Sequence, residues 1–445
     1  MKGSAAEGES GISLPKGGGA IQGIGETFRP DLFTGTGNHS IPIATTPGRS
    51  GFGPSLSLQY SSGNGNGAFG LGWALATPRV TRKTEKGLPR YDNDDVFVLT
   101  GAEDLVPVLE RIVDPVSGEV RWTPAQPHRR AGFIVTAFRP RTEGLFARIE
   151  RWTNENTDAT HWRSITRDNI TSLFGQTPGS RLSDPTDPSR VYEWLLDEMR
   201  DAYGNRVVYE YAADDPRLYT SINPSERLPS LAERNRVATQ RYLRRILYAN
   251  LPEPLLDAQG QPLRYGDGAP VGQARGAQRY ALELVFDYGD WDINRPTHPQ
   301  SAESERPEQF GLPSAAVAGA TPVPLREDRF SSHRAGFEVR TLRLCRRVLM
   351  FHHFSELGGP TLVRSTDFTF RTDEHSRLSL LVAATVSGHR LPSQGAAYRS
   401  ASMPPVEFRY AQFQPHKQRY QSLKGGRRQL SWPLDDNYPG RWGRA

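Results

Sequence analysis

The run from Phe330 to Phe354, FSSHRAGFEVRTLRLCRRVLMFHHF, gathers residue types that could do chemistry. It holds the single cysteine of the chain, Cys345, and two adjacent histidines, His352 and His353. A thiolate among arginines could act as a nucleophile, and histidines could bind a metal ion. Adjacent residues of a strand face opposite sides, however, so these histidines could not share one ion. No orienting histidine lies at a known spacing from Cys345, so we predict that the run is scaffold.

Two other motifs match functional sites only in part. Asp92, Asp94 and Asp95 supply acidic side chains, but the glycine and the distal glutamate of an EF-hand calcium loop are missing. The three glycines at 17–19 are not followed by the Lys-Ser/Thr pair of a phosphate-binding loop. We therefore predict no catalytic, cofactor-binding or metal-binding residue in this sequence.

The elements that would position these residues are predicted to be strands. The chain has 43 glycines and 35 prolines, and its aromatic and β-branched residues form short alternating runs between turns. A hairpin is predicted at 193–211, around the turn formers Gly204 and Asn205. Further strands are predicted at 93–100, 241–250, 281–290, 365–373 and 405–413. Long loops at 252–279 and 292–329 separate some of them and could serve as binding surface.

A strand pair is predicted near the N-terminus. Ile41 and Ile43 share one face of the first strand, and Leu56, Leu58 and Tyr60 share one face of the second. The glycine-rich segment 62–73 then forms a loop that ends at Trp73, a residue large enough to cap a core.

The segment from Gly336 to His353 is predicted to form one long strand. It contains no proline and no interior glycine, and its apolar residues change from odd positions (Phe337, Val339) to even positions (Leu342, Leu344). A β-bulge produces such a change of phase. The alternative is a helix with Leu342, Arg346 and Leu349 along one side.

Composition and charge exclude several classes of protein. The net charge is +6, but acidic and basic residues are mixed through the same segments, so we expect no nucleic-acid binding. A single cysteine excludes an intrachain disulfide bond. No apolar run approaches the roughly 20 residues that span a bilayer, and residues 1–10 lack the apolar core of a signal peptide. If the protein is secreted, another export route must act on a cytoplasmic precursor.

Several segments, above all 330–354, resemble a known family. They are SGISLPKGGGAIQGIGETF (10–28), FGLGWAL (69–75), MRDAYGNRVVYEY (199–211) and RYLRRILYAN (241–250). The chain is similar, over roughly 10–436, to the N-terminal domain shared by the Salmonella plasmid virulence protein B and the B components of insecticidal toxin complexes. The resemblance implies an all-β fold with large curved antiparallel sheets, long loops and few short helices, forming the start of a YD-repeat shell.

The resemblance also implies a scaffold function without catalysis. The shell encloses a cytotoxic C-terminal polypeptide and docks on a pore-forming subunit, so proteins are the expected partners. An ADP-ribosylating enzyme is one alternative, because Glu303–Glu305 match the E-x-E motif of that class, although the surrounding context is missing. A surface-binding or adhesin module that uses the long loops is another.

Three regions are expected: a glycine-rich leader at 1–30, the toxin-complex domain at 31–390, and a final strand with the lead-in to a β-propeller at 391–445. The sequence stops before propeller and YD-repeat text, which indicates a truncated gene or a remainder encoded separately. We expect the residues after Ser387 to be the most exposed, because a shell sheet closes against its next segment.

Overall fold

The structure is a computed structural model of residues 1–445. It describes residues 27–31, 35–101, 104–214, 238–251, 279–289, 309–310, 325–357, 360–390 and 398–410. The strands belong to one compact unit that extends to Phe408. Strands dominate the described residues, and the helices among them are the short 3-10 turns Arg49–Gly51, Pro178–Ser180 and Ser355–Leu357. The predicted all-β fold with few short helices is therefore confirmed.

One part of this unit is a closed ring of antiparallel strands, which we call the barrel. Its strands pair in the order β7, β8, β9, β13, β14, β15, β16 and β18, and β18 pairs again with β7. Their bounds are β7 Arg79–Arg82, β8 Phe97–Leu99, β9 Asp104–Pro107, β13 Phe133–Pro140, β14 Arg148–Asn154, β15 Thr160–Ile165, β16 Thr171–Phe174 and β18 Val191–Arg200.

Aromatic side chains fill the barrel. Trp162 lies 4.9 Å from both Phe97 and Phe138, and 6.1 Å from Trp194, between ring centroids. All four side chains are buried. Such edge-on and tilted aromatic pairs combine a large buried apolar area with specific geometry, so this cluster fixes how the barrel closes.

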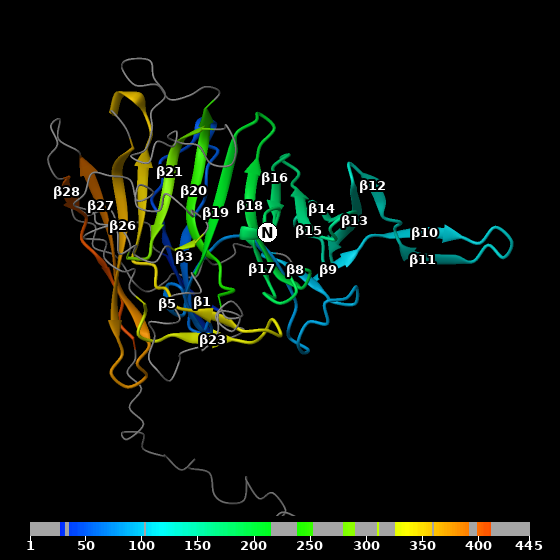
Figure 1. The fold of residues 1–445 in the computed structure, drawn as a ribbon, viewed down its shortest axis with the longest axis horizontal. Coiled ribbons are helices and arrows are strands. Elements are labelled where there is room, and N and C mark those ends of the chain that lie inside the picture. The colour runs from blue at the N-terminus through cyan, green and yellow to red at the C-terminus, as the bar shows by residue number, and fades with distance from the viewer. Residues whose placement is uncertain are drawn as a thin grey trace, which may run out of the picture. The chain divides into compact units, whose positions relative to one another are not determined.

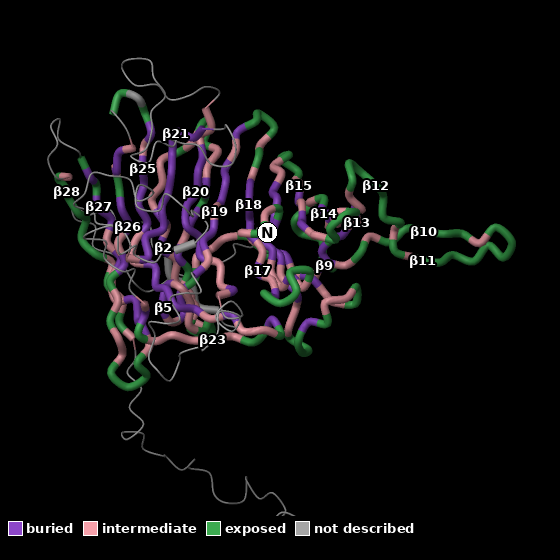
Figure 2. The backbone as a smooth tube through the Cα atoms, in the orientation of Figure 1, coloured by how far each residue is buried: buried purple, intermediate pink, exposed green. Residues whose placement is uncertain are grey.

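Strand β18 also begins an open antiparallel sheet. It continues through β19 (Arg206–Asp214), β20 (Tyr242–Leu251), β21 (Arg279–Asp287), β25 (Arg347–His352), β26 (Thr361–Thr372) and β27 (Ser379–Arg390). Figure 1 shows these strands side by side, from β18 in green to β27 in orange. Seven of the ten residues of β20 and all nine of β21 are buried, and Figure 2 shows the buried residues in purple. The sheet is thus the main wall of the unit.

The predicted hairpin at 193–211 is confirmed as β18 and β19. Glu198 pairs with Val208, and Arg200 pairs with Arg206. The turn is held by Asp201, whose carboxylate accepts the N–H groups of Tyr203 and Asn205. The alternating side chains and the turn-forming residues therefore both predicted this hairpin correctly.

The predicted N-terminal strand pair is also confirmed, as part of a smaller sheet. Its strands are β1 (Thr27–Asp31), β2 (Thr36–Pro42), β3 (Ser57–Ser61) and β6 (Trp73–Leu75). Ile41 pairs with Leu58, and both are fully buried. The hydroxyl of Tyr248 on β20 donates to the carbonyl of Thr46, so the connection between β2 and β3 is tied to the large sheet.

The loop before Trp73 needs glycine for two reasons. Gly72 has φ +81°, in the left-handed region. A Cβ atom at Gly72 would also lie 2.4 Å from the ring of Tyr60. Trp73 itself is buried, as its predicted capping role requires.

The prediction of one long strand from Gly336 to His353 is wrong. The segment forms β24 (Val339–Thr341), which pairs with β23 (Phe330–Ser332), and then β25, which pairs with β21 and β26. Between them, residues 342–346 form neither strand nor helix, so the helix alternative is wrong as well. Residues 342–345 are all buried, because this segment crosses the core between two pairing partners. The change of the apolar residues from odd to even positions therefore reflects this crossing and not a β-bulge.

Short strands accompany the last long strand. β28 (Arg399–Ser402) pairs with Ser387–Arg390 of β27, and β29 (Val406–Glu407) pairs with Ala383 and Ala384. All four residues of β28 are exposed. The expected exposure beyond 410, most of the loops 252–279 and 292–329, and the leader before Thr27 lie outside the described residues.

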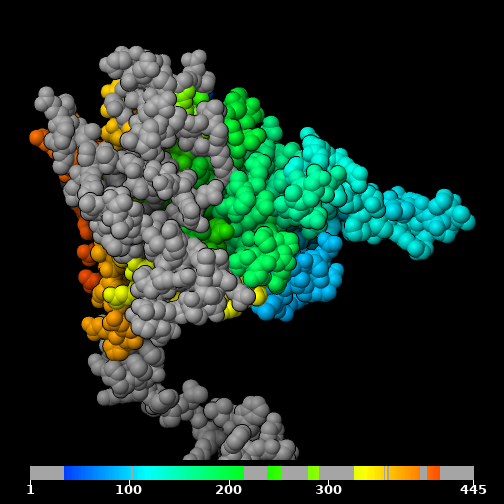
Figure 3. Space-filling model, viewed as in Figure 1, coloured from blue at the N-terminus to red at the C-terminus, as the bar shows by residue number. Residues whose placement is uncertain are grey.

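One hairpin has a different environment. β10 (Leu109–Val113) and β11 (Val120–Pro124) pair only with each other, and we call residues 109–124 the arm. Figures 1 and 3 show the arm in cyan, projecting away from the barrel. Nearly all of its strand residues are exposed. An isolated two-stranded hairpin is at best marginally stable in water, so the arm suits contact with another surface.

Candidate functional site

The structure places Cys345 in the interior. Its side chain is fully buried, and its Sγ lies 3.5 Å from the carbonyl oxygen of Arg347. Its N–H donates to the carbonyl of Ala68, which ties residues 342–346, which we call the crossing segment, to the glycine-rich segment 62–73. Nucleophilic cysteines occupy partly exposed sites, whereas this thiol packs in the main apolar core.

The two histidines contact different partners. His352 Nε2 lies 2.8 Å from Thr46 Oγ1, and His353 Nε2 lies 2.7 Å from Glu283 Oε2. Burial and the neighbouring His353 lower the pKa of His352. The adjacent rings therefore contact two different segments: His352 contacts the connection between β2 and β3, and His353 contacts β21.

The acidic residues near 92–95 are engaged by arginine and backbone groups. Asp95 accepts a hydrogen bond of 2.6 Å from Arg82, and it also accepts the N–H groups of Arg90 and Tyr91. Asp92 accepts the N–H of Asp94 and pairs with Arg90. In the described part of the chain, no group of three or more His, Cys, Asp or Glu side chains is arranged to hold a metal ion. The glycines at 17–19 and Glu303–Glu305 lie outside that part.

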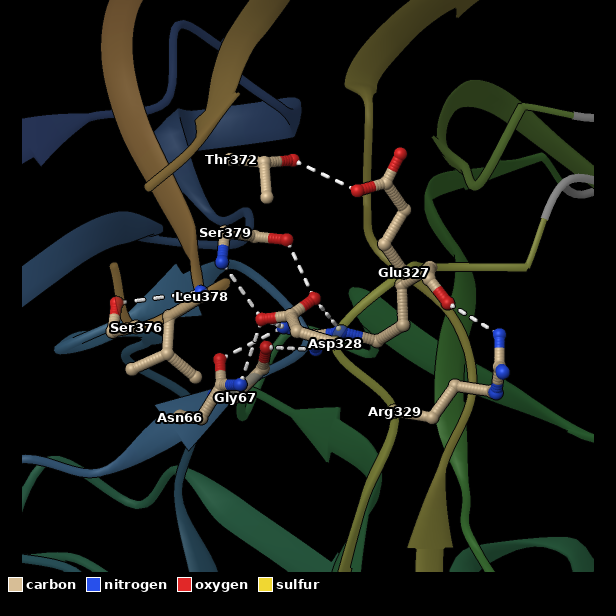
Figure 4. Close-up of polar contacts among 10 residues, drawn as sticks. Asn66, Gly67, Glu327, Asp328, Arg329, Thr372, Ser376, Leu378 and Ser379 are labelled. Atoms are coloured by element: carbon tan, nitrogen blue, oxygen red, sulfur yellow. Dashed lines mark hydrogen bonds and ion pairs between the residues drawn. The ribbon is translucent and has the colours of Figure 1, made fainter. Parts of the chain in front are cut away.

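A dense polar cluster is centred on Asp328 (Figure 4). Its carboxylate accepts from Arg326 Nε and Nη2 at 2.9 Å each, from Asn66 Nδ2 at 2.9 Å, and from the N–H and hydroxyl of Ser379 at 2.7 and 2.6 Å. Arg326 also donates to the carbonyl of Gly67 at 2.6 Å. We call Asn66, Gly67, Arg326, Asp328 and Ser379 the Asp328 hub.

The two charged side chains of the Asp328 hub are paired with each other and shielded from solvent. The Arg326 and Asp328 side chains are 0% and 4% exposed. Burial opposes ionisation of Asp328, but the hydrogen bonds from Arg326, Ser379 and Asn66 outweigh it and hold its pKa well below its usual range. With its hydrogen bonds occupied in this way, the carboxylate is suited to joining three chain segments. No local sequence motif marked this cluster.

Other buried ion pairs follow the large sheet. Arg343 Nε lies 2.7 Å from Asp214 Oδ1, and Arg347 Nε lies 2.6 Å from Asp287 Oδ2. Tyr242 also donates to Asp214, at 3.0 Å. The buried Arg343 and the partly buried Arg347 are each matched by a buried carboxylate, which is how a protein keeps charge in its interior. These pairs join residues 342–346 to β19, and β25 to β21.

His161 should make the fold sensitive to mild acid. It stacks on Trp152, with centroids 5.8 Å apart, and burial together with Arg181 lowers its pKa to about 4. Because the folded pKa lies below the unfolded value, stability is expected to fall as pH drops from 6.5 to 4, by on the order of 2–3 kcal/mol. Urea unfolding at both pH values would measure this loss. The loss should shrink in His161→Phe, and an equal loss in that variant would contradict the prediction.

The comparisons with known proteins agree with this architecture. Residues 32–354 match the family described as Salmonella virulence plasmid 65kDa B protein. The chain is 34% identical over 395 residues to the mono(ADP-ribosyl)transferase SpvB of Salmonella choleraesuis, and 33% identical to that of Salmonella typhimurium. The alignments cover 87% of this chain but 58% of each relative, so the chain spans little more than half of their length.

Solved structures match the same region. The crystal structure of TcdB2–TccC3 superimposes with a TM-score of 0.66 at 30% identity, over 92% of this chain and 18% of the other. The N-terminal domain of the effector SpvB from Salmonella typhimurium strain LT2 gives a TM-score of 0.59 at 30% identity, over 79% of this chain and 98% of that domain. The match to SpvB therefore lies in its N-terminal domain.

No helix in the described residues is long and apolar enough to cross a membrane. The resemblance to the family inferred from the sequence is confirmed by fold and by sequence together. The chain belongs to the family described as Salmonella virulence plasmid 65kDa B protein.

Proposed function

We propose that the chain is a structural segment of a toxin-complex shell, which helps to enclose a cytotoxic C-terminal polypeptide. The observation that carries this proposal is the match to TcdB2–TccC3 across 92% of the chain. That chain is several times longer, so the matching region is one segment of a larger assembly. The physical character of the described residues supports a wall: a broad sheet, a closed barrel, and buried charges that are paired with one another.

The proposed partners are proteins, namely the polypeptide that completes the shell and, through it, a pore-forming subunit. A structure of the Photorhabdus luminescens Tc holotoxin pore also matches, with a TM-score of 0.66 and 30% identity over 92% of this chain. Secretion without a classical signal peptide, after a cytoplasmic stage, is the localisation that fits this assembly.

A chimaera would test the proposed function. In it, residues 27–408 replace the matching segment of TcdB2–TccC3, and the deletion without replacement is the control. We expect the chimaera to elute as one soluble species and to protect the hypervariable C-terminal region from protease as well as the parent measured alongside. A chimaera that aggregates or is digested like the deletion would contradict the proposal.

The arm is the proposed contact element toward the rest of the shell. By register, Leu109, Val113, Val120 and Trp122 share one face. Trp122 is 63% exposed and Val116, at the tip, is 95% exposed. Among the described residues, six of the thirteen exposed large hydrophobic side chains lie within this hairpin, so apolar surface is concentrated there. Such concentration marks interaction sites.

Replacing Trp122 with serine should separate folding from assembly. The side chain is exposed, so the free energy of unfolding of the chain should change by less than about 0.5 kcal/mol. Assembly of the chimaera should weaken, measured as the fraction that elutes intact. Tyr203→Ser is the matched control, because Tyr203 is 89% exposed at the β18–β19 turn. Equal effects of the two substitutions would remove the arm from the interface.

An ADP-ribosyltransferase is the second candidate, because the curated relatives carry that name. The part of SpvB that this chain matches is its N-terminal domain. The E-x-E triplet at Glu303–Glu305 is the residue set that this alternative would use. The two candidates differ in whether the chain transfers ADP-ribose at all.

A further inference from the structure

Two buried N–H donors inside the barrel have no acceptor among the residues that the structure describes. They are Nε of Arg151 on β14 and Nε1 of Trp162 on β15. The two residues are directly opposite each other in the strand register, so both side chains project from the same face of the sheet. Trp162 is fully buried. Buried donors are nearly always satisfied, so two orphans at paired positions call for an explanation.

The side chains of Arg151 and Trp162 pack against the same two aromatic rings. The guanidinium carbon of Arg151 is 5.6 Å from the ring centroids of Phe97 and of Phe138. The indole of Trp162 is 4.9 Å from both. The same two phenyl rings therefore pack against both groups. They keep both groups in a low-dielectric environment, where an unpaired donor destabilises the fold.

The charge at this end of the barrel is unbalanced. Arg82 lies 5.0 Å from the Phe97 ring and is paired with Asp95 at 2.6 Å. Within the described ranges Arg151 contacts no carboxylate, and its hydrogen-bond partner is the neutral amide oxygen of Asn93, 3.3 Å from Nη2. Burial, together with the like charge of Arg82, lowers the pKa of Arg151.

We propose that Arg151 and Trp162 form a binding site for one oxyanion, in the first place a carboxylate of an acidic peptide side chain. The Nε–Nη2 edge of a guanidinium matches a carboxylate with two parallel hydrogen bonds, and the indole N–H is a pure donor. Asn93 occupies Nη2 at the long distance of 3.3 Å, so its amide is the group that the ligand displaces. Asp95 pairs with Arg82 and leaves the positive charge of Arg151 unmatched, and the bound anion would neutralise that charge.

The test uses the full chain and measures binding by calorimetry and by the shift in melting temperature, at constant ionic strength. The probes are N-acetylglutamate amide, inorganic phosphate and the neutral N-acetylglutamine amide. We expect millimolar binding of the glutamate probe, at least a tenfold loss in Arg151→Gln, and an intermediate loss in Arg151→Lys, which keeps the charge without the fork. Arg111→Gln, an exposed arginine on the arm, is the matched control and should bind as the unaltered chain does.

Tighter binding of phosphate than of the glutamate probe, with the same dependence on Arg151, identifies a free anion as the source. Binding that is equal in the unaltered chain and in Arg151→Gln overturns the site. So does equal binding of the neutral glutamine probe, because the site would then recognise no charge. Arg151→Gln is expected to fold in either case, since it removes an unmatched charge, and its melting temperature without ligand is the check.

Discussion

Replacing Asp328 with alanine is expected to lower the free energy of unfolding by about 3–5 kcal/mol, because it leaves a buried guanidinium without its partner. Arg326 is fully buried and bonds to Asp328 through two nitrogen atoms. The substitution also removes the acceptor for Asn66 and for Ser379 on β27. Urea unfolding at pH 7, followed by far-ultraviolet circular dichroism, would measure the loss.

The same carboxylate fixes the pH dependence of this effect. The folded pKa of Asp328 is held below the unfolded value, so its contribution is complete above about pH 4 and is lost as pH falls through the folded pKa. The difference between the unaltered chain and Asp328→Ala should therefore shrink in acid. Asp168→Ala, at an exposed turn, is the matched control and should cost less than about 0.5 kcal/mol. Similar losses in the two variants would show that the hub does not stabilise the fold.

Replacing Arg343 with methionine is expected to lower the free energy of unfolding by about 3–5 kcal/mol, because it removes the guanidinium that lies 2.7 Å from the buried carboxylate of Asp214. The two side chains are 0% and 1% exposed. The double variant Arg343→Met/Asp214→Leu should recover most of that loss, since replacing both partners of a buried pair by apolar residues is often neutral. The measurement is a double-mutant cycle of unfolding free energies.

The matched control for Arg343 is Arg334→Met, at an exposed turn of the same run. This control should change stability little. A loss below about 1 kcal/mol in Arg343→Met, or a double variant as unstable as the single one, would show that the pair does not hold the crossing segment in place.

The alternation of apolar and polar residues predicted the fold correctly where the paired strands lie close together in the sequence. The β18–β19 hairpin was predictable because alternation, turn residues and pairing all lie within about twenty residues. The strand pair of Ile41 and Leu58 was predictable for the same reason. The segment 336–353 was not, because its backbone changes partner between β23 and β21, and periodicity carries no information on partners.

The clusters depend on contacts that are distant in sequence. Asn66 and Asp328 are 262 residues apart, and Tyr242 and Leu342 are 100 residues apart. Barrel closure joins Val80 to Trp194. None of these residues belongs to a local motif, so the sequence could not predict which charged side chains meet in the core. It did show that Cys345 and the histidines lack the spacing of a catalytic site.

Transfer of ADP-ribose from labelled NAD to actin tests most directly whether this chain is scaffold or enzyme. The purified chain and its Glu305→Gln variant would be incubated under identical conditions, with the labelled actin counted after electrophoresis. The scaffold account predicts that both give the same background as actin and NAD alone. Transfer by the unaltered chain that disappears in Glu305→Gln would contradict it.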